Sequence, residues 1–250
     1  MLEKLKNEVY KANLELVKNG LVIHTWGNAS GRDHKSGLIV IKPSGVDYEV
    51  MKAEDMVVVD IDGKIVDGKF KPSTDLPTHL ELYKSYESIG GIVHTHSTYA
   101  TSWAQAGRSI PAFGTTHADH FYGPVPCTRM LTDNEIETDY ELNTGKVIIQ
   151  TLSTTPPLNI PSVLVNSHGP FSWGKDAAES VYNAIALEQI ARMAFYTVLL
   201  GRNEPVDSAL LDKHFNRKHG KDAYYGQPPT LNCPPAPLKG GKFRDIKEVK

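Results

Sequence analysis

Two histidines separated by a single residue, His94 and His96, are the first candidates for chemistry in this sequence. They follow the apolar pair Ile92 and Val93, which comes after two glycines, and this pattern is typical of a buried strand. Residues i and i+2 of a strand point to the same face, so the two imidazoles would lie side by side and could bind one metal ion. The alternative is a pair of polar histidines on a solvated strand face, and the spacing by itself leaves both interpretations open.

Two further residues could complete a metal site. His168 directly follows a predicted strand and precedes Gly169 near the start of a predicted long helix, and Asp75 lies between a polar turn and another predicted helix. Three histidines and a carboxylate, each at the end of a regular element, match a catalytic zinc site with room for a substrate. Taken singly, His168 could be a surface or helix-capping histidine, and Asp75 could be an ordinary helix N-cap.

Three short polar loops form a second candidate site. They carry Gly27-Asn28, Ser44-Gly45 and Ser73-Thr74, and each pair combines a small polar side chain with a backbone that a ligand can approach closely. With Lys42 as a source of positive charge, the loops could surround a phosphate group with neutral donors. Small polar loops are also ordinary turns, so the pattern is unspecific by itself.

The elements that must position these residues begin with a helix and an antiparallel sheet. Apolar residues at steps of three and four predict a first helix that ends near Asn19-Gly20. Strands are predicted at 38–41, 56–60 and 64–66, and Asp62-Gly63 is a strong hairpin signal between the last two. The remaining predictions are helices at about 78–86, 99–106, 184–198 and 210–219, strands around His94 and at 146–149 and 162–165, and an irregular segment at 110–121.

Composition and charge restrict the class of protein. The 250 residues allow one large or two small domains, and a formal net charge of −2 gives no electrostatic case for binding nucleic acid or an acidic membrane. The N-terminal residues lack the pattern of a signal peptide, and no uninterrupted apolar run approaches membrane-spanning length. Only two cysteines occur, Cys127 and Cys233, so a disulfide framework is excluded and a cytoplasmic protein is predicted.

The residues after Gln227 differ in composition from the rest. Several prolines are followed by a glycine pair and a lysine-rich end, without the apolar periodicity that packing requires. We expect a catalytic domain over 1–227, and a disordered tail or artificial extension over 228–250.

Several motifs in combination resemble the class II aldolase family, which also includes adducin-like proteins. The motifs are Trp26-Gly27-Asn28, Lys42-Pro43-Ser44-Gly45, Ser73-Thr74-Asp75, His94-Thr95-His96, Gly114-Thr115-Thr116-His117-Ala118-Asp119 and Ser167-His168-Gly169-Pro170. The segments 211–214, 218–220 and 223–227 narrow the resemblance to the branch that interconverts L-ribulose 5-phosphate and D-xylulose 5-phosphate. The resemblance extends over about residues 1–227.

The resemblance implies an α/β fold in a single domain, with a mostly antiparallel central sheet flanked by helices on both sides. It implies a homotetramer of C4 symmetry in which neighbouring subunits share active sites, and a small phosphorylated ketopentose as substrate. It also implies a role in carbohydrate metabolism, in arabinose catabolism or in the breakdown of ascorbate-derived pentoses. Neither nucleic acid nor a membrane is expected as a partner.

The resemblance also assigns roles to individual residues. The metal ligands would be His94, His96 and His168, with Asp75 as a fourth, acidic position. Asp119 would be an acid/base residue on the same subunit as the histidines, and Tyr225 a second one from the adjacent subunit. Substrate-binding residues would be Gly27, Asn28, Lys42, Ser44, Gly45, Ser73 and Thr74, together with Glu141, His214 and Arg217, which reach a neighbouring subunit's site. Zn²⁺ is the expected ion, although imidazole and carboxylate also suit Mn²⁺ and other divalent ions.

The expected reaction breaks and re-forms a carbon–carbon bond. In a 2-ketopentose 5-phosphate the C4 hydrogen is not adjacent to the C2 carbonyl, so its removal as a proton would leave an unstabilised carbanion. Breaking the bond between C3 and C4 instead leaves electrons that the carbonyl delocalises, and a zinc ion would stabilise this charge. Rotation of the two-carbon fragment and re-addition then invert C4, with one acid/base residue on each face. The alternatives are an aldolase acting on fuculose or rhamnulose 1-phosphate, and a non-catalytic adducin-like interaction module.

Overall fold

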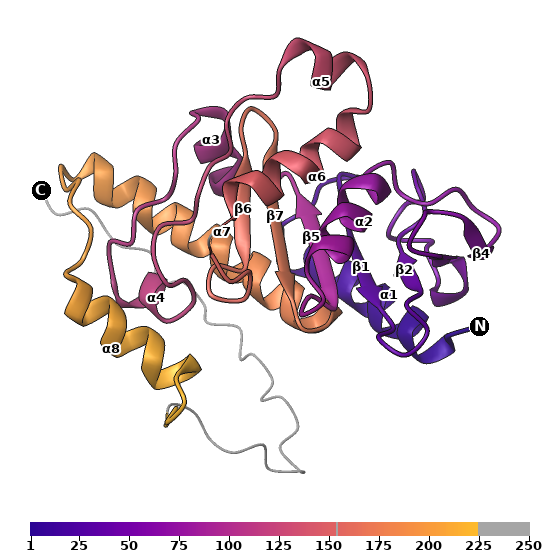
Figure 1. The fold of residues 1–250 in the computed structure, drawn as a ribbon, viewed down its shortest axis with the longest axis horizontal. Helices are drawn as coiled ribbons and strands as arrows, with labels where there is room; N and C mark the ends of the chain where they lie inside the picture. Colours follow the sequence, from indigo (N-terminus) through magenta and orange to yellow (C-terminus); the bar gives the residue numbers. More distant parts are fainter. Residues whose placement is uncertain (154, 225–250) are drawn as a thin grey trace, which may run out of the picture.

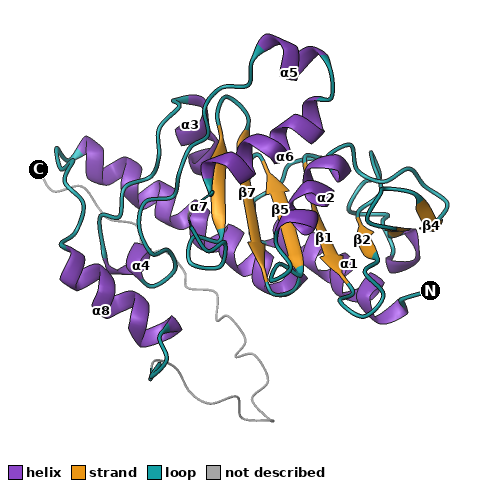
Figure 2. Ribbon diagram, in the orientation of Figure 1, coloured by secondary structure: helices purple, strands orange, loops and turns teal. Residues whose placement is uncertain are grey.

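A single antiparallel sheet forms the centre of the molecule (Figure 2). The computed structural model describes residues 1–153 and 155–224. Within them, seven strands are arranged in the order β4-β3-β2-β1-β5-β7-β6, and every neighbouring pair is antiparallel. Their bounds are β1 (Gly27–Arg32), β2 (Ile39–Ile41), β3 (Val57–Val59), β4 (Ile65–Asp67), β5 (Gly91–Thr95), β6 (Ser162–Val165) and β7 (Gly169–Gly174). The predicted fold class is confirmed.

Helices cover both faces of this sheet (Figure 1). On one face α2 and α6 pack against each other and over a core that includes Ile41 and Ile148, and on the other α1 and α7 cover a core that includes Val9 and Val40. Beyond β6, α4 and α8 pack together away from β1–β4. The bounds are α1 (Glu3–Lys18), η1 (Ala53–Asp55), α2 (Leu76–Ser85), α3 (Thr98–Gln105), α4 (Thr115–Ala118), α5 (Asp133–Glu137), α6 (Tyr140–Thr151), α7 (Ala177–Leu199) and α8 (Ser208–His219).

Two sequence-based predictions of secondary structure are wrong. The run 146–149 was predicted as a strand, but it lies in α6. Val147 and Ile148 are on the buried face of this helix, whereas Lys146 is exposed and Ile149 is half-buried. The long helix does not follow His168 directly, because β7 comes between them and makes a hairpin with β6. His168 therefore lies at the turn of a β-hairpin, where Ser167 adopts a left-handed backbone with φ 60°.

The pairing of β1 with β5 creates the geometry of the site. Asn28 is directly opposite His94, and Gly27 is opposite Thr95, so the polar end of β1 lies beside the histidine-bearing end of β5. Gly27 has φ 122°, and a Cβ atom there would lie 2.9 Å from the carbonyl oxygen of His94. A glycine is therefore required where the two backbones approach most closely. Among the described residues, no helix is both long and apolar enough to cross a membrane.

Candidate active site

Three imidazoles converge at one end of the sheet. The candidate ligand atoms of His94, His96 and His168 all lie within 4.8 Å of one another, and the Nε2 atoms of His94 and His96 are 3.1 Å apart. His94 is buried, His168 is half-buried and His96 is exposed, so the cluster is accessible from solvent through His96. Strand β5 supplies the first two ligands by the i, i+2 alternation predicted from the sequence, and the β6–β7 turn supplies the third.

The surroundings of these imidazoles fit a divalent metal ion. The Nδ1–H of His94 donates to the carbonyl oxygen of Pro170 at 3.0 Å, which leaves Nε2 with its lone pair toward the cluster. The Nδ1 atom of His168 lies 3.2 Å from the hydroxyl of Tyr140, so its other ring nitrogen remains for a ligand. Burial, with repulsion from His94 and His96, lowers the pKa of His168 to about 3, and metal ligation requires such neutral imidazoles.

The Asp75 carboxylate lies beside this cluster. Its Oδ2 atom accepts a hydrogen bond of 2.6 Å from the side-chain amide of Asn28. Burial opposes its ionisation, but the neighbouring His94 and His79 imidazoles and the Asn28 amide hold the pKa of Asp75 below its usual range. Asp75 precedes α2 without capping it through its side chain, so the helix-cap interpretation does not account for it. It lines the same pocket as the histidines but is not one of the three converging ligands.

The polar loops surround a cavity of about 530 Å³ that opens onto the histidines. The size suits a sugar phosphate. The loops are tied to one another, because the Ser73 N–H donates to the Lys42 carbonyl at 3.0 Å and the Ser44 N–H donates to the Lys71 carbonyl at 2.9 Å. The lining includes every residue predicted for the phosphate site, namely Gly27, Asn28, Lys42, Ser44, Gly45, Ser73 and Thr74, and also Thr25, Trp26 and Pro43.

Lys42 holds its own loop together. Its side chain is buried, and its ammonium donates to the carbonyl oxygens of Val46 at 2.9 Å and Pro43 at 3.3 Å. The same ammonium lies 4.6 Å from the centre of the Tyr48 ring, whose hydroxyl donates to the Gly27 carbonyl at 2.8 Å. Burial lowers the pKa of Lys42 to about 8. The lysine thus shapes the loop as well as contributing charge near the cavity.

Helices α4 and α8 lie side by side (Figure 1), and a second cluster of charged residues joins them. The Asp119 carboxylate accepts hydrogen bonds from Arg217 Nη2 at 2.7 Å and Nε at 3.0 Å, and its Oδ1 lies 3.1 Å from His214 Nδ1. Although burial opposes ionisation, the Arg217 and His214 contacts hold the pKa of Asp119 below its usual range. We call Asp119, His214 and Arg217 the carboxylate cluster. None of its members lines the histidine cavity of the same chain.

Comparison with known proteins identifies the family. The model of the class II aldolase and adducin N-terminal domain matches residues 7–195. The chain belongs to this family.

The relatives are enzymes of two kinds, epimerases and aldolases. The L-ribulose-5-phosphate 4-epimerase UlaF of Salmonella paratyphi B is 58% identical over 229 residues, covering 90% of this chain and all of that protein, and the protein of the same name from Salmonella typhi matches equally. Among solved structures, an L-fuculose 1-phosphate aldolase superposes with a TM-score of 0.73 and 25% identity, covering 86% of this chain and 95% of that one. The L-fuculose-1-phosphate aldolase of Thermus thermophilus has a TM-score of 0.61, 21% identity and coverages of 81% and 98%, and it shows the shared fold.

Not all residues expected from the family resemblance lie where the sequence analysis placed them. Asp119 was expected on the histidine side of a shared site, with His214 and Arg217 on the neighbour's side, but the three lie together in one chain. Glu141 lies in the first turn of α6, where its backbone carbonyl accepts a hydrogen bond of 2.6 Å from Thr78. Tyr225 lies outside the described residues, as does the predicted tail.

The sequence analysis missed several side chains that contact the three clustered histidines. Tyr140 contacts His168, and Phe171 stacks on His94 with ring centres 4.3 Å apart. Both residues are adjacent in sequence to positions already singled out, Glu141 and Pro170, which is the only signal that could have drawn attention to them. His79 is also buried close by, and its ring is edge-on to Phe171 at 6.1 Å.

Proposed function

We propose that this chain is an L-ribulose-5-phosphate 4-epimerase, interconverting L-ribulose 5-phosphate and D-xylulose 5-phosphate. The observation that carries the proposal is the 58% identity to UlaF over the full length of that protein. The cavity supports it chemically, because three clustered imidazoles and the polar loops that could bind a phosphate line the same space. Inversion at C4 would proceed by breaking and re-forming the C3–C4 bond, since the C4 hydrogen is not acidic.

The polar loops would hold the phosphate throughout the reaction. The hydroxyls of Ser44, Ser73 and Thr74 and the backbone N–H groups of Gly45 and Thr74 can donate to phosphate oxygens without bringing a large fixed charge. Firm anchoring keeps the two-carbon fragment in place, so that it turns and is attacked again instead of diffusing away. The buried Oδ1 of Asn28 has no partner among the described residues and can accept a hydrogen bond from a substrate hydroxyl.

His94, His96 and His168 would hold the divalent ion, which we expect to be Zn²⁺, and Asp75 would approach it from the loop side. When bound, the ion would supply Lewis-acid stabilisation of the negative charge that develops as the C3–C4 bond breaks. The chain itself orients the ligands through the Pro170 carbonyl and the Tyr140 hydroxyl. It also leaves His96 exposed in the lining of the cavity, where a substrate could reach the ion.

Proton transfer at the C4 oxygen would be the task of Asp119 and Tyr225. Asp119 is ionised in its contact with Arg217, so it would act first as a proton acceptor. Because the carboxylate cluster does not line the cavity of its own chain, we propose that it enters the cavity of a neighbouring subunit in a homotetramer. Glu141 and Tyr225 would complete this shared site.

The deciding experiment is an epimerisation assay on both pentose phosphates, with and without a chelator. The proposal predicts that L-ribulose 5-phosphate and D-xylulose 5-phosphate approach one equilibrium mixture, that the chelator abolishes the reaction and that Zn²⁺ restores it. The rival is an aldolase, favoured by the structural similarity to L-fuculose 1-phosphate aldolase. Release of free fragments from L-fuculose 1-phosphate, without epimerisation of L-ribulose 5-phosphate, would establish the rival.

A further inference from the structure

The sheet opens beside the phosphate loops because β2 leaves β1 before β1 ends. Strand β1 pairs with β5 from Gly27 to Gly31, but it pairs with β2 only from Ser30 to Arg32. Beyond Ile41 the chain turns away to form the Lys42–Gly45 loop, and only a long contact of 3.4 Å remains between the Lys42 N–H and the Ala29 carbonyl. At Ala29 the edge of β1 therefore has no strand residue directly beside it on this side.

The side chain of Asn13 occupies this position. Its Oδ1 atom accepts a hydrogen bond of 2.9 Å from the Ala29 N–H, and its Nδ2 donates at 3.2 Å to the Ala29 carbonyl. Nδ2 also donates to the Val9 carbonyl at 2.8 Å, one turn earlier in α1. A carboxamide has the donor and acceptor of a peptide group, so Asn13 pairs with Ala29 as a strand residue would. Both residues are fully buried, where an unpaired backbone group is costly.

Asn13 holds in place the first residues of β1, which line the cavity. Successive strand residues point to opposite faces, so Ala29 packs into the core beneath α1 while Asn28 points to the face that carries His94. The Asn28 amide then bonds Ser73 at 3.0 Å and Asp75 at 2.6 Å. Because Ala29 is held in place, the neighbouring Asn28 is also held, and Asn28 in turn orients the Ser73 loop and Asp75.

We propose that Asn13, which does not line the cavity, is a positioning residue for the phosphate side of the pocket. It substitutes for a strand at the point where the sheet must open, and so lets β2 diverge without leaving Ala29 unpaired. The three histidines are held from β5 and the β6–β7 turn, so their convergence does not depend on Asn13, whereas the position of Asp75 does. The role of the phosphate rests on the proposed function, whereas the pairing of Asn13 with Ala29 does not.

The test compares Asn13→Ala and Asn13→Asp with Asn7→Ala. Asn7 lies on the same helix and makes the same bond to the carbonyl four residues earlier, but it is exposed and this side-chain bond stays within the helix. Three quantities are measured: hydrogen exchange of the Ala29 amide, the Kd of inorganic phosphate, and KM and kcat for L-ribulose 5-phosphate. Metal content is the internal control.

For Asn13→Ala we expect Ala29 exchange at least about a hundredfold faster, and KM and phosphate Kd raised about tenfold or more, with full metal content and a smaller fall in kcat. Asn13→Asp keeps an oxygen for the Ala29 N–H, so its exchange rate, KM and phosphate Kd should lie between those of the wild type and Asn13→Ala. Asn7→Ala should match the wild type. Unchanged exchange, or faster exchange and lower stability with unchanged KM and Kd, would overturn the proposal.

Failure of both Asn13 variants to fold would reveal a residue needed for the whole fold, and would equally overturn the narrower role. A wild-type protein without epimerase activity would count against the proposed function alone, because exchange and phosphate affinity would still decide the role of Asn13.

Discussion

At the scale of single residues, the histidine cluster depends on contacts that are not ligands. His94 is fixed by a backbone carbonyl at Nδ1 and by the face of Phe171, which together set the direction of its free nitrogen. His168 lies on a turn and has only the Tyr140 hydroxyl at its Nδ1 atom. Metal affinity should therefore be most sensitive to substitutions around His168.

Tyr140→Phe tests this dependence. The variant keeps the ring and loses the hydroxyl 3.2 Å from His168, so the imidazole is no longer oriented. We expect a metal affinity about 10- to 100-fold weaker, the usual effect of losing such a partner, with little change in stability. Competition with a chromophoric chelator measures it. Tyr196→Phe, which removes a hydroxyl contact with Tyr99 on the exposed surface, is the matched control and should bind metal normally.

Gly27→Ala tests the close approach of β1 to β5. A methyl group at Gly27 would meet the His94 carbonyl at 2.9 Å and a Val22 methyl at 2.7 Å, in addition to the cost of its left-handed backbone. The comparison is Gly20→Ala, with φ 68° and open space around the new methyl, which should cost only about 1–2 kcal/mol of backbone strain. Urea unfolding should show a clearly larger loss of stability for Gly27→Ala than for Gly20→Ala. Equal losses would mean that the strands separate without difficulty.

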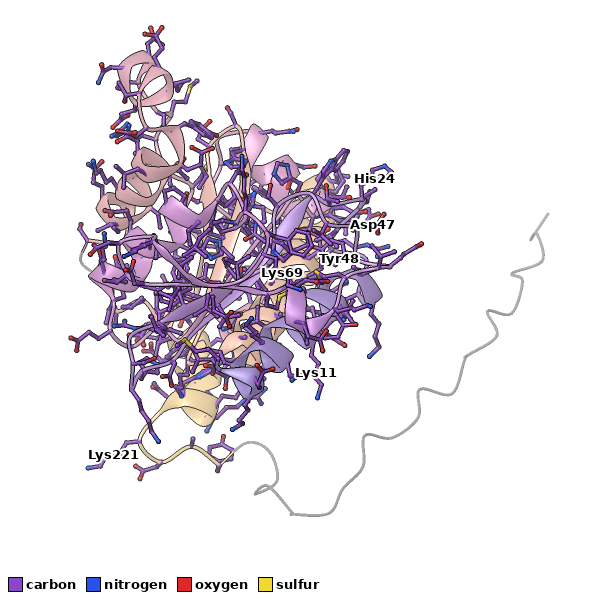
Figure 3. The ribbon with its side chains drawn as sticks, turned by 90° about the vertical axis from the view of Figure 1, so that its right-hand side faces the viewer. Lys11, His24, Asp47, Tyr48, Lys69 and Lys221 are labelled. Carbon is purple, nitrogen blue, oxygen red and sulfur yellow. The ribbon has the colours of Figure 1, made fainter. Side chains whose placement is uncertain are left out.

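At the scale of elements, the loop from Lys42 to Tyr48 combines binding with structure. In Figure 3, Asp47 lies toward the edge of the molecule and Tyr48 further in. The ammonium of Lys42 bonds two carbonyls of this loop from a buried position. Keeping this charge buried near the cavity lowers the stability of the folded protein. Burial lowers the pKa of Lys42 to about 8, and the negative charge of Asp47 raises it in part.

Lys42→Met tests this cost through pH. The folded protein releases the Lys42 proton near pH 8, whereas the unfolded chain keeps it to about pH 10.4. Between these values the unfolded state binds more protons, so the free energy of unfolding rises with pH, by about 2 kcal/mol from pH 8 to pH 10. Urea titrations of Lys42→Met should lack this rise, and Lys64→Met, at an exposed position, should retain it. The same slope in both variants would assign the effect to other groups.

Prediction from the sequence succeeded where pattern and burial agree. Helix α1 and strand β6 lie within a residue or two of their predicted ranges, because their apolar spacing matches the faces they bury. It failed at β1 and β7, whose sequences GNASGR and GPFSWG lack the alternation and β-branched residues of ordinary strands. Both are central strands with neighbours on each side, and close packing there selects glycine and serine over strand propensity.

The site could be predicted to a similar extent. Motif resemblance predicted the residues of the histidine cavity, because ligands and loops are read from residue types. It did not reveal Tyr140, Phe171 or Asn13, which act through contacts between distant segments. The grouping of Asp119 with α8 was also beyond it, since no spacing rule relates positions so far apart.

At the scale of the whole molecule, the cavity and the carboxylate cluster are separate parts of one chain. Mixing inactive Asp119→Asn with inactive His96→Asn should therefore restore activity after subunit exchange, because a hybrid oligomer joins an intact cavity to an intact cluster. For random exchange in a ring, about a quarter of the sites should be intact. Mixing Asp119→Asn with Arg217→Ala, both in the same cluster, should restore nothing. Activity from the second mixture, or none from the first, would place Asp119 with its own histidines.

The order of the strands also bears on how the protein is made. Strands β1 to β4 follow one another as a meander and carry the phosphate loops and Asp75, whereas β5, β7 and β6 carry all three histidines. Among the described strands, the two groups are joined by the pairing of β1 with β5, a pairing between distant segments that is slow to form during folding. During synthesis, the residues of the phosphate loops and Asp75 therefore leave the ribosome before any of the three histidines. Weakening of the β1–β5 pairing would leave a protein that still takes up metal but no longer binds the sugar phosphate tightly.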